Sequence, residues 1–270
     1  MNGDNLKNMY LNKILENKKI EIEKAKNIVS LNSIIKRCKK VNFKTKSLCT
    51  AINKSHHISL IAEIKRKSPS KGILVGRLNP VVLAQIYEAS GASAISVLTD
   101  TEFFGGSLKD LEDVKKTVHI PVLRKEFIID KYQIYQSYAS GADAVLLIAG
   151  ILTLKELENF SHLSHSLGMQ VLCEVHTEEE LKCVLDCKEK INIIGINNRN
   201  LETLDLNLNT TEQIIKHIPK DRVVVSESGI KNYEDVLHLQ SLGVQAILVG
   251  ETLITAEDVQ LKIKELLGNE

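Results

Sequence analysis

The sequence contains no tryptophan, and only 4% of its 270 residues are aromatic. Its most basic stretch, residues 1–54, offers only Tyr10 and Phe43 for stacking on bases, which argues against nucleic-acid binding. No G-x-G-x-x-G turn follows the first predicted strand, as a dinucleotide site would require. None of the eight histidines belongs to a catalytic or metal-ligating pattern. We therefore expect neither a nucleic-acid partner nor a dinucleotide cofactor.

Cysteines are few, and long apolar runs are absent. The five cysteines are odd in number and follow no disulfide or zinc-finger spacing, which suits a reducing compartment. Cys183 and Cys187 lie four apart on one predicted helix, where core packing is the expected role. No apolar run could span a bilayer, and the first ten residues contain no apolar signal core. These features predict a soluble, cytoplasmic protein without a membrane partner.

Charge is distributed unevenly, although the formal net charge is only +1. Residues 1–54 contain 13 Lys and Arg against 4 Asp and Glu, a net charge of +9, and the remainder contains 22 against 30, a net charge of −8. The simplest interpretation is a helical extension with a solvated, lysine-rich face. A second hypothesis is that this basic lobe lies partly over a binding site and attracts an anionic ligand.

From residue 60 onward, short runs of Val, Ile and Leu alternate regularly with amphipathic stretches. Most of the runs are apolar without alternation, as expected when both faces of a strand are covered. The predicted strands are 60–65, 94–99, 121–126, 144–148, 170–175, 192–197, 222–227 and 246–249. The predicted helices are 80–90, 107–117, 131–140, 153–167, 177–187, 209–217, 232–242 and 257–267.

Eight β/α units favour a (β/α)8 TIM barrel over residues 60–270. A doubly wound open sheet is the structural alternative. Residues 1–59 do not fit the repeat, but they contain one helical pattern at 10–27 and another around 31–38. Because so few apolar residues could not form a core of their own, we expect an N-terminal helical extension packed on the barrel, and one domain overall.

Polar side chains stand at the predicted C-terminal ends of the strands, where barrel enzymes carry their functional groups. Side chains two apart on a strand share a face, so Glu63 with Lys65 and Lys125 with Phe127 are expected to point into the barrel mouth. Each residue has a structural alternative as an ion pair, helix cap or turn residue. Their gathering at one end of several strands favours a site. The polar residues are Glu63, Lys65, Lys125, Glu174, Asn197, Arg199, Glu227 and Ser228.

The last two strands are followed by glycines at positions that suit phosphate binding. Ser228 and Gly229 follow the seventh strand, and Gly250 follows the eighth, before a short helical segment. In this fold these loops and a helix N-terminus frequently bind phosphate through backbone N–H groups. Either glycine alone could simply permit a tight turn. The pairing of the two favours a phosphate site.

A series of segments resembles the indole-3-glycerol phosphate synthase family, in the family's order and over nearly the whole barrel. The segments are IAEIKRKSPSKG (61–72), SVLTD with FFGGS (96–107), PVLRKEFIID (121–130), GADAVLLI (141–148), EV (174–175), IGINNRNLETL (194–204), VSESGI (225–230) and LVGETL (248–253). The segment YLNKILENKK also looks like the family's leading helix. Glu126 and Asn200 depart from the pattern, since Asp is usual at both positions, which puts fine positioning in question.

The resemblance implies a carboxy-lyase of tryptophan biosynthesis. Its substrate would be 1-(2-carboxyphenylamino)-1-deoxyribulose 5-phosphate, an anionic phosphosugar derivative, closed to indole-3-glycerol phosphate with loss of carbon dioxide and water. No redox step occurs, so no cofactor and no metal are expected. We expect a monomer or a weak homodimer.

The resemblance also implies roles for individual residues. Lys125 would be the general acid in ring closure. Lys65 would contact substrate anions and act as the acid in dehydration, while Glu63 or Glu174 handles a proton, and the choice between these two carboxylates is open. Asn197 would orient the substrate, with Arg199 as a carboxylate or loop partner and Glu227 holding the lysine network or the sugar hydroxyls.

The remaining implied contacts bind the two ends of the substrate. The phosphate would be held by Ser228, Gly229, Gly250 and the backbone N–H of Glu251. Ser68, Phe104 and Phe127 would contact the substrate, the two phenylalanine rings forming an apolar slot for the anthranilate ring. We also expect the loop at 66–72 to close over bound substrate, with a hinge at Gly72 and restricted by Pro69.

Two other functions differ in chemistry. Another phosphosugar barrel enzyme, such as phosphoribosylanthranilate isomerase, would share the phosphate site but is expected to use a Cys/Asp pair, and the first strand has no cysteine. A non-catalytic nucleic-acid-binding protein would use the basic lobe or KRKSPSK as a patch. That short motif is common by chance.

Overall fold

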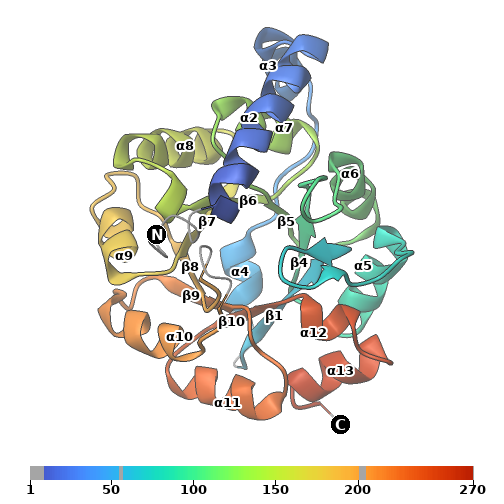
Figure 1. Cartoon of the computed structure of the whole chain (residues 1–270), viewed down its shortest axis with the longest axis vertical. Coiled ribbons are helices and arrows are strands. Elements are labelled where there is room, and N and C mark those ends of the chain that lie inside the picture. The colour runs from blue at the N-terminus through green and yellow to red at the C-terminus, as the bar shows by residue number, and fades with distance from the viewer. Residues whose placement is uncertain (1–8, 55–56, 201–204, 270) are drawn as a thin grey trace.

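The structure is a computed structural model that describes residues 9–54, 57–200 and 205–269 (Figure 1). Eight parallel strands close into a barrel in the order β1-β10-β9-β8-β7-β6-β5-β4, so the expected (β/α)8 fold is confirmed. The open-sheet alternative is wrong, because β1 pairs with both β4 and β10. The strands are β1 (Ser59–Ile64), β4 (Ala94–Leu98), β5 (Val122–Lys125), β6 (Ala144–Ile148), β7 (Gln170–Val175), β8 (Ile193–Asn197), β9 (Val223–Glu227) and β10 (Ala246–Val249).

The helices surround the barrel at the positions that the sequence pattern predicts (Figure 1). Left-handed glycines follow several of them, including Gly91 at φ 104° and Gly141 at φ 94°, as expected for helix C-terminal ends. The barrel helices are α5 (Pro80–Ala89), α6 (Leu108–Thr117), α7 (Lys131–Ala139), α8 (Leu154–Ser166), α9 (Glu178–Leu185), α10 (Asn209–Ile214) with the 3-10 turn η2 (Ile215–His217), α11 (Tyr233–Ser241) and α13 (Val259–Leu266). No helix in these described ranges is long and apolar enough to cross a membrane.

Several short elements lie between the main ones. The expected loop at 66–72 contains a two-stranded antiparallel hairpin, β2 (Lys67–Ser68) with β3 (Gly72–Ile73). The other short elements are α4 (Leu48–Ile52), the 3-10 turn η1 (Ala149–Ile151) and α12 (Glu251–Ile254), which is the short helix expected after Gly250. The end of the 194–204 motif, residues 201–204, and the first eight residues of the extension lie outside the described ranges.

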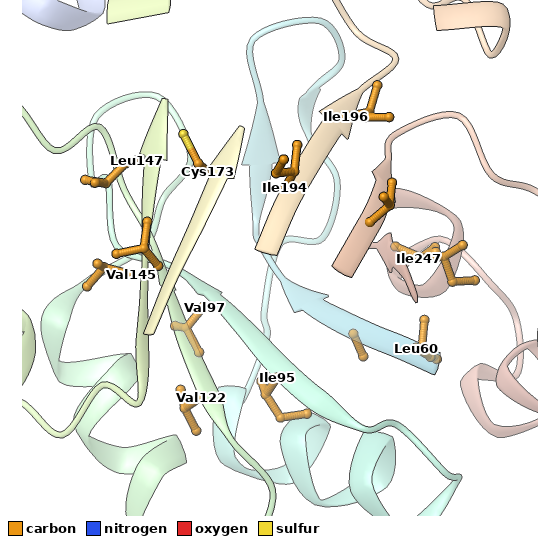
Figure 2. Packing of buried hydrophobic residues seen from close by; sticks show 14 of the residues in the cluster. Leu60, Ile95, Val97, Val122, Val145, Leu147, Cys173, Ile194, Ile196 and Ile247 are labelled. Carbon is orange, nitrogen blue, oxygen red and sulfur yellow. The ribbon is translucent and has the colours of Figure 1, made fainter. Parts of the chain in front are cut away.

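Each strand is buried on both faces, which explains its unbroken apolar sequence. One set of strand side chains, with Leu60, Val145 and Ile247 among them, packs between the strands and the helices (Figure 2). Ala62 and Ile64 belong to this set, whereas Ile61 packs with the barrel interior. The inward direction of position 61 makes Glu63 the next inward residue, so β1 delivers its carboxylate to the barrel mouth.

The N-terminal extension forms α2 (Met9–Ile28) and α3 (Leu31–Cys38). Tyr132 at the start of α7 donates its hydroxyl to the backbone oxygens of Ala25 (3.2 Å) and Val29 (2.9 Å), which ties the end of α2 to the barrel. Ile14 and Ile22 are buried, whereas Ile20 is 55% exposed, because α2 buries only a narrow stripe.

Asp143, directly before β6, joins three parts of the chain. Its fully buried carboxylate accepts the backbone N–H groups of Lys46 (2.7 Å) and Val122 (2.8 Å) and lies 2.5 Å from Lys115 Nζ on α6. The segment leading into α4, strand β5 and helix α6 are therefore held by one side chain. Removing it would leave two backbone donors and a largely buried ammonium group without their acceptor.

We expect Asp143→Ala to lower the free energy of unfolding by about 3 kcal/mol, because breaking a buried pair leaves an uncompensated charge. Urea unfolding followed by circular dichroism measures the change. Asp113→Ala is the matched control, since its partner Lys109 is 72% exposed, and such pairs contribute about 0.5 kcal/mol. Equal effects of the two substitutions would contradict this account of Asp143.

Candidate active site

A pocket opens at the C-terminal end of the barrel strands, bordered by α2. Every residue that the sequence placed in the site lines this pocket. They are Glu63, Lys65, Ser68, Phe104, Lys125, Phe127, Glu174, Asn197, Arg199, Glu227, Ser228, Gly229, Gly250 and Glu251. The closed barrel brings together strand ends that are far apart in the chain, such as Ile64 of β1 and Val249 of β10, whose strands lie side by side in Figure 1.

Lys125, at the end of β5, is the centre of the polar side of the pocket. Its Nζ lies 2.6 Å from Glu174 Oε2 on β7 and also contacts Glu227 Oε2 on β9. Burial opposes the lysine charge, but Glu174, Glu227 and Glu63 outweigh it and raise the pKa of Lys125 above its ordinary value. Lys125 is therefore held as a cation with its donor group at the barrel axis.

The two carboxylates beside Lys125 have different environments. Glu174 accepts Lys125 on one oxygen and Asn197 Nδ2 (3.0 Å) on the other. Burial alone would raise the pKa of Glu174, but the cations Lys125 and His176 hold it well below its usual range. Burial raises the pKa of Glu227 to about 8, with Lys125 opposing and Glu174 adding to the rise. Of the two carboxyl groups, Glu227 therefore has the higher affinity for a proton.

Two glycines, Gly195 and Gly250, leave the space that the carboxylates of Glu227 and Glu63 occupy. Gly195 on β8 lies opposite Glu174, and a Cβ at this position would collide with Glu227 Oε1. Gly250 serves Glu63 in the same way, because a Cβ there would lie 2.5 Å from Glu63 Oε1. Gly250 thus has a packing requirement in addition to the phosphate role that the sequence suggested.

Lys65 and Glu63 form a second ion pair in the pocket wall at the end of β1. Lys65 Nζ lies 2.9 Å from Glu63 Oε1. Glu63 is 4% exposed. This pair is separate from the Lys125 cluster in its direct contacts. The pocket therefore has two acid–base units, one on β1 and one spread over β5, β7 and β9.

The hairpin after β1 lies over one side of the pocket. Arg66 fixes its base by pairing with Asp110 (2.6 Å), and Lys71 at its tip lies 2.6 Å from Glu251 Oε1 on α12. Ser70 lies 3.4 Å from Arg199 Nη1. Gly72 has a φ of 68°, which suits the hinge predicted there. Closure on substrate binding stays a prediction.

The loop after β9 has an unusual backbone. Ser228 (φ 68°) and Gly229 (φ 86°) are consecutive left-handed residues, and Ser228 is the one non-glycine with positive φ in the described ranges. Such strain is characteristic of functional sites, and successive backbone N–H groups in such turns can form an anion-binding concavity. The loop lies beside Gly250 and Glu251 in the lining of the pocket.

Part of the pocket wall is apolar and contains Phe104 and Phe127. The rings of Phe104 and Phe127 lie 6.0 Å apart at 38°. Tyr10, Leu11 and Ile14 of α2 complete this side, so the extension contributes directly to the pocket. Three residues of α2 thus lie at the mouth, and the hypothesis that the basic lobe covers the mouth and attracts substrate stays a prediction.

Lys18 attaches α2 to the mouth. Its Nζ lies 2.8 Å from Asp100 Oδ2 and 3.0 Å from Glu126 Oε1, and its side chain is 3% exposed. Burial opposes its charge, but Glu126 and Asp100 outweigh it and raise the pKa of Lys18 above its ordinary value. Glu126, one of the two departures from the family pattern, is thus the residue next to Lys125 that holds the extension.

Lys18 and His176 were missed in the sequence. His176 follows Glu174 by two positions at the end of β7, so the same-face rule that linked Glu63 to Lys65 would have found it. In the structure His176 Nε2 lies 3.2 Å from Glu174 Oε1, so it contacts a residue of the pocket from outside the lining. Lys18 gave no such signal, because nothing local shows which lysine of a basic helix is buried. In the described residues no cluster of His, Cys, Asp or Glu could hold a metal ion.

Comparison with known proteins agrees with this geometry. A sequence model of the family described as indole-3-glycerol phosphate synthase matches residues 11–266. The chain belongs to this family. An indole-3-glycerol phosphate synthase of Alkaliphilus metalliredigens is 45% identical over 96% of this chain and 98% of the relative, and one of Caldanaerobacter subterraneus is 46% identical over 96% and 100%. The predicted enzyme class, a carboxy-lyase of tryptophan biosynthesis, is confirmed.

Solved structures show the barrel at lower identity. The 3-hexulose-6-phosphate synthase of Salmonella typhimurium superposes with a TM-score of 0.62 at 13% identity, covering 78% of this chain and 97% of that one. A chain of the tryptophan synthase complex of Pyrococcus furiosus gives a TM-score of 0.56 at 16% identity, covering 78% and 98%. At these identities the likeness shows the shared fold alone.

The raised pKa of Glu227 predicts a pH-dependent loss of stability. Between the ordinary value of 4.5 and about 8, the unfolded chain releases this proton while the folded chain keeps it, so stability falls as pH rises. Glu227→Gln removes the loss, and we expect the variant to gain roughly 1–3 kcal/mol relative to the parent between pH 5 and pH 8.

Thermal unfolding midpoints at pH 5 and pH 8 measure this gain. Glu212→Gln, on the surface of α10 beside Lys216, is the control, and its midpoint should fall between the two pH values as that of the parent does. A Glu227→Gln midpoint that follows the parent at both pH values would contradict a protonated Glu227.

Proposed function

We propose that this pocket closes 1-(2-carboxyphenylamino)-1-deoxyribulose 5-phosphate to indole-3-glycerol phosphate, with release of carbon dioxide and water. The observation that carries the proposal is the Lys125 ammonium group held between the carboxyl groups of Glu174 and Glu227. Ring closure requires a proton donor at the ketone oxygen, and the donor must be positioned before the reaction. The apolar wall around Phe104 and Phe127 suits the aromatic ring.

Ring closure is assigned to the Lys125 unit. The ring carbon that bears the carboxylate attacks the ketone carbon, and Lys125 gives its proton to the oxygen as the new bond forms. The C–CO2 bond then breaks, and its electron pair restores the aromatic ring. An alkoxide is more basic than an amine, so the transfer is downhill, and the proton on Glu227 can replace the one that Lys125 loses.

Dehydration is assigned to the Lys65 and Glu63 pair. Lys65 protonates the hydroxyl, which leaves as water, and Glu63 takes the proton from the carbon next to the ring nitrogen, so the indole double bond forms. Glu174 is less suited to this second role, because a carboxylate whose pKa is held far below its usual range is a weak base. Its role is to hold Lys125 and, with Asn197, to fix the site.

The other pocket residues bind the substrate at its ends. The phosphate is assigned to the loop of Ser228 and Gly229 and to the backbone at Gly250 and Glu251, where the strained turn supports anion binding. Arg199 and the hairpin residue Ser68 are assigned to the substrate carboxylate and sugar side. The partner that this proposal assigns to the pocket is therefore a small anionic molecule.

We extend the proposal to the molecule as a whole. Residues 1–59 and 60–270 form one domain, supported by the burial of Lys18 in the barrel mouth. The enzyme acts in the cytoplasm as a monomer or weak homodimer without a nucleic-acid partner, supported by its five free cysteines and its paucity of exposed aromatic residues. Gel filtration with light scattering measures the oligomeric state.

Lys125→Met, which keeps an unbranched side chain one atom shorter and removes the charge, should lower kcat by a factor of about 10³, as expected for loss of a general acid. The test follows indole fluorescence after addition of the carboxyphenylamino-deoxyribulose phosphate to the purified protein. KM should change less than kcat, because the phosphate and ring contacts are intact. Lys109→Met, an exposed lysine on α6, is the control.

Equal turnover by the parent and Lys125→Met would refute the role of Lys125. No turnover by the parent would refute the proposed substrate. The two outcomes can be told apart, because turnover by the parent protein alone tests the substrate, and only the comparison with Lys125→Met tests the role of Lys125.

A further inference from the structure

His176 occupies a position behind the active site that the reaction as described does not use. It follows β7 and lies between Glu174 and Glu180 of α9. Its Nε2 lies 3.2 Å from Glu174 Oε1, and its Nδ1 lies 3.1 Å from Glu180 Oε2. Its side chain is only 9% exposed. The ring therefore separates the pocket from the α9 side of the barrel with a carboxylate on each side.

Two carboxylates at the two ring nitrogens determine the protonation of this histidine. A neutral imidazole carries one N–H and one lone pair, so in this position its lone pair would face a carboxylate oxygen. A doubly protonated ring presents a proton to each oxygen. Nε2 is buried and lies close to Glu174 without the alignment of a hydrogen bond, so its interaction is mainly that of opposite charges. Two flanking carboxylates therefore favour an imidazolium ion over a neutral ring.

The surroundings fix Glu180 in place for this pairing. The backbone N–H of His176 donates to the same Glu180 oxygen, at 2.7 Å. Gly150 in η1 packs directly on the other oxygen, where a Cβ would come within 2.6 Å. Both oxygens of Glu180 are therefore held in place, and the carboxylate stays against His176. Burial alone would lower the pKa of His176, but Glu174 and Glu180 outweigh it and raise this pKa to about 10.

We propose that His176 is a positioning residue for the reaction, a buried imidazolium that holds Glu174 as an ionised carboxylate facing Lys125. The charged groups around Glu174 are then Lys125 on β5, Glu227 on β9 and His176. Two cations beside Glu174, and one beside Glu227, decide which of the two carboxyl groups carries the shared proton. His176 thereby keeps the proton on Glu227, where it can replace the one that Lys125 gives to substrate. The inference rests on the proposed role of Lys125.

The first test needs no substrate. In the uniformly 15N-labelled protein, one of the eight imidazole rings should stay doubly protonated at pH 8.5, and its signal should be absent from His176→Gln. In Glu174→Gln the same ring should titrate at least one pH unit lower. If all eight rings are neutral at pH 8.5 in the parent protein, the proposal is wrong, whatever the enzyme's activity.

The second test is the pH profile of turnover. His176→Gln keeps a polar group of similar size without the charge, so the acid limb of kcat/KM should move up by about one pH unit, with kcat reduced and KM nearly unchanged. His176→Lys restores a cation and should bring the limb back toward the parent position. A structural role alone would predict that Gln substitutes better than Lys.

His165→Gln is the matched control, because His165 Nδ1 also lies 2.6 Å from a carboxylate, that of Glu189, but outside the pocket on α8. It should leave the profile unchanged. A His176→Gln profile that superposes on the parent and on His165→Gln would overturn the proposal. Loss of turnover in the parent would instead refute the proposed function, and the imidazole titration would still decide the charge of His176.

Discussion

An ammonium group taken out of water must be compensated by negative charge, and at the mouth of this barrel Glu174 and Glu227 provide that charge for Lys125. The three residues come from β5, β7 and β9, so their contact depends on closure of the sheet. Neighbouring residues hold the two carboxylates of this contact in position. Gly195 leaves room for the Glu227 carboxylate, and Asn197 donates to Glu174 and so fixes its orientation.

Charge alternates outward from this contact. Glu180 faces His176, His176 faces Glu174, and Glu174 faces Lys125, with Glu227 on its other side. In such a series each group sets the protonation of the next, and the titration belongs to the whole set rather than to one member. An active site built in this way keeps a cationic acid beside a carboxyl group whose pKa is raised, an arrangement that isolated side chains would not adopt.

The N-terminal extension also carries a buried ammonium group, that of Lys18, whose charge carboxylates near the mouth compensate. Lys18 of α2 is buried against Asp100 and Glu126, one position along from Lys125. The helix that carries Lys18 also supplies apolar lining to the pocket through Ile14. The extension is therefore attached by a buried ion cluster at the point where it contributes to the site, which couples its docking to the shape of the pocket.

The sequence determined the order and limits of the barrel elements, because a strand covered on both faces and a helix covered on one leave distinct periodic patterns. It also identified the strand-end residues, since Glu63 and Lys125 interrupt apolar runs. It could not show which lysine of the extension is buried, or that His176 lies between two carboxylates, or which carboxyl group carries the proton. These depend on distances between residues far apart in the chain, and burial and charge at those distances exist only in the folded barrel.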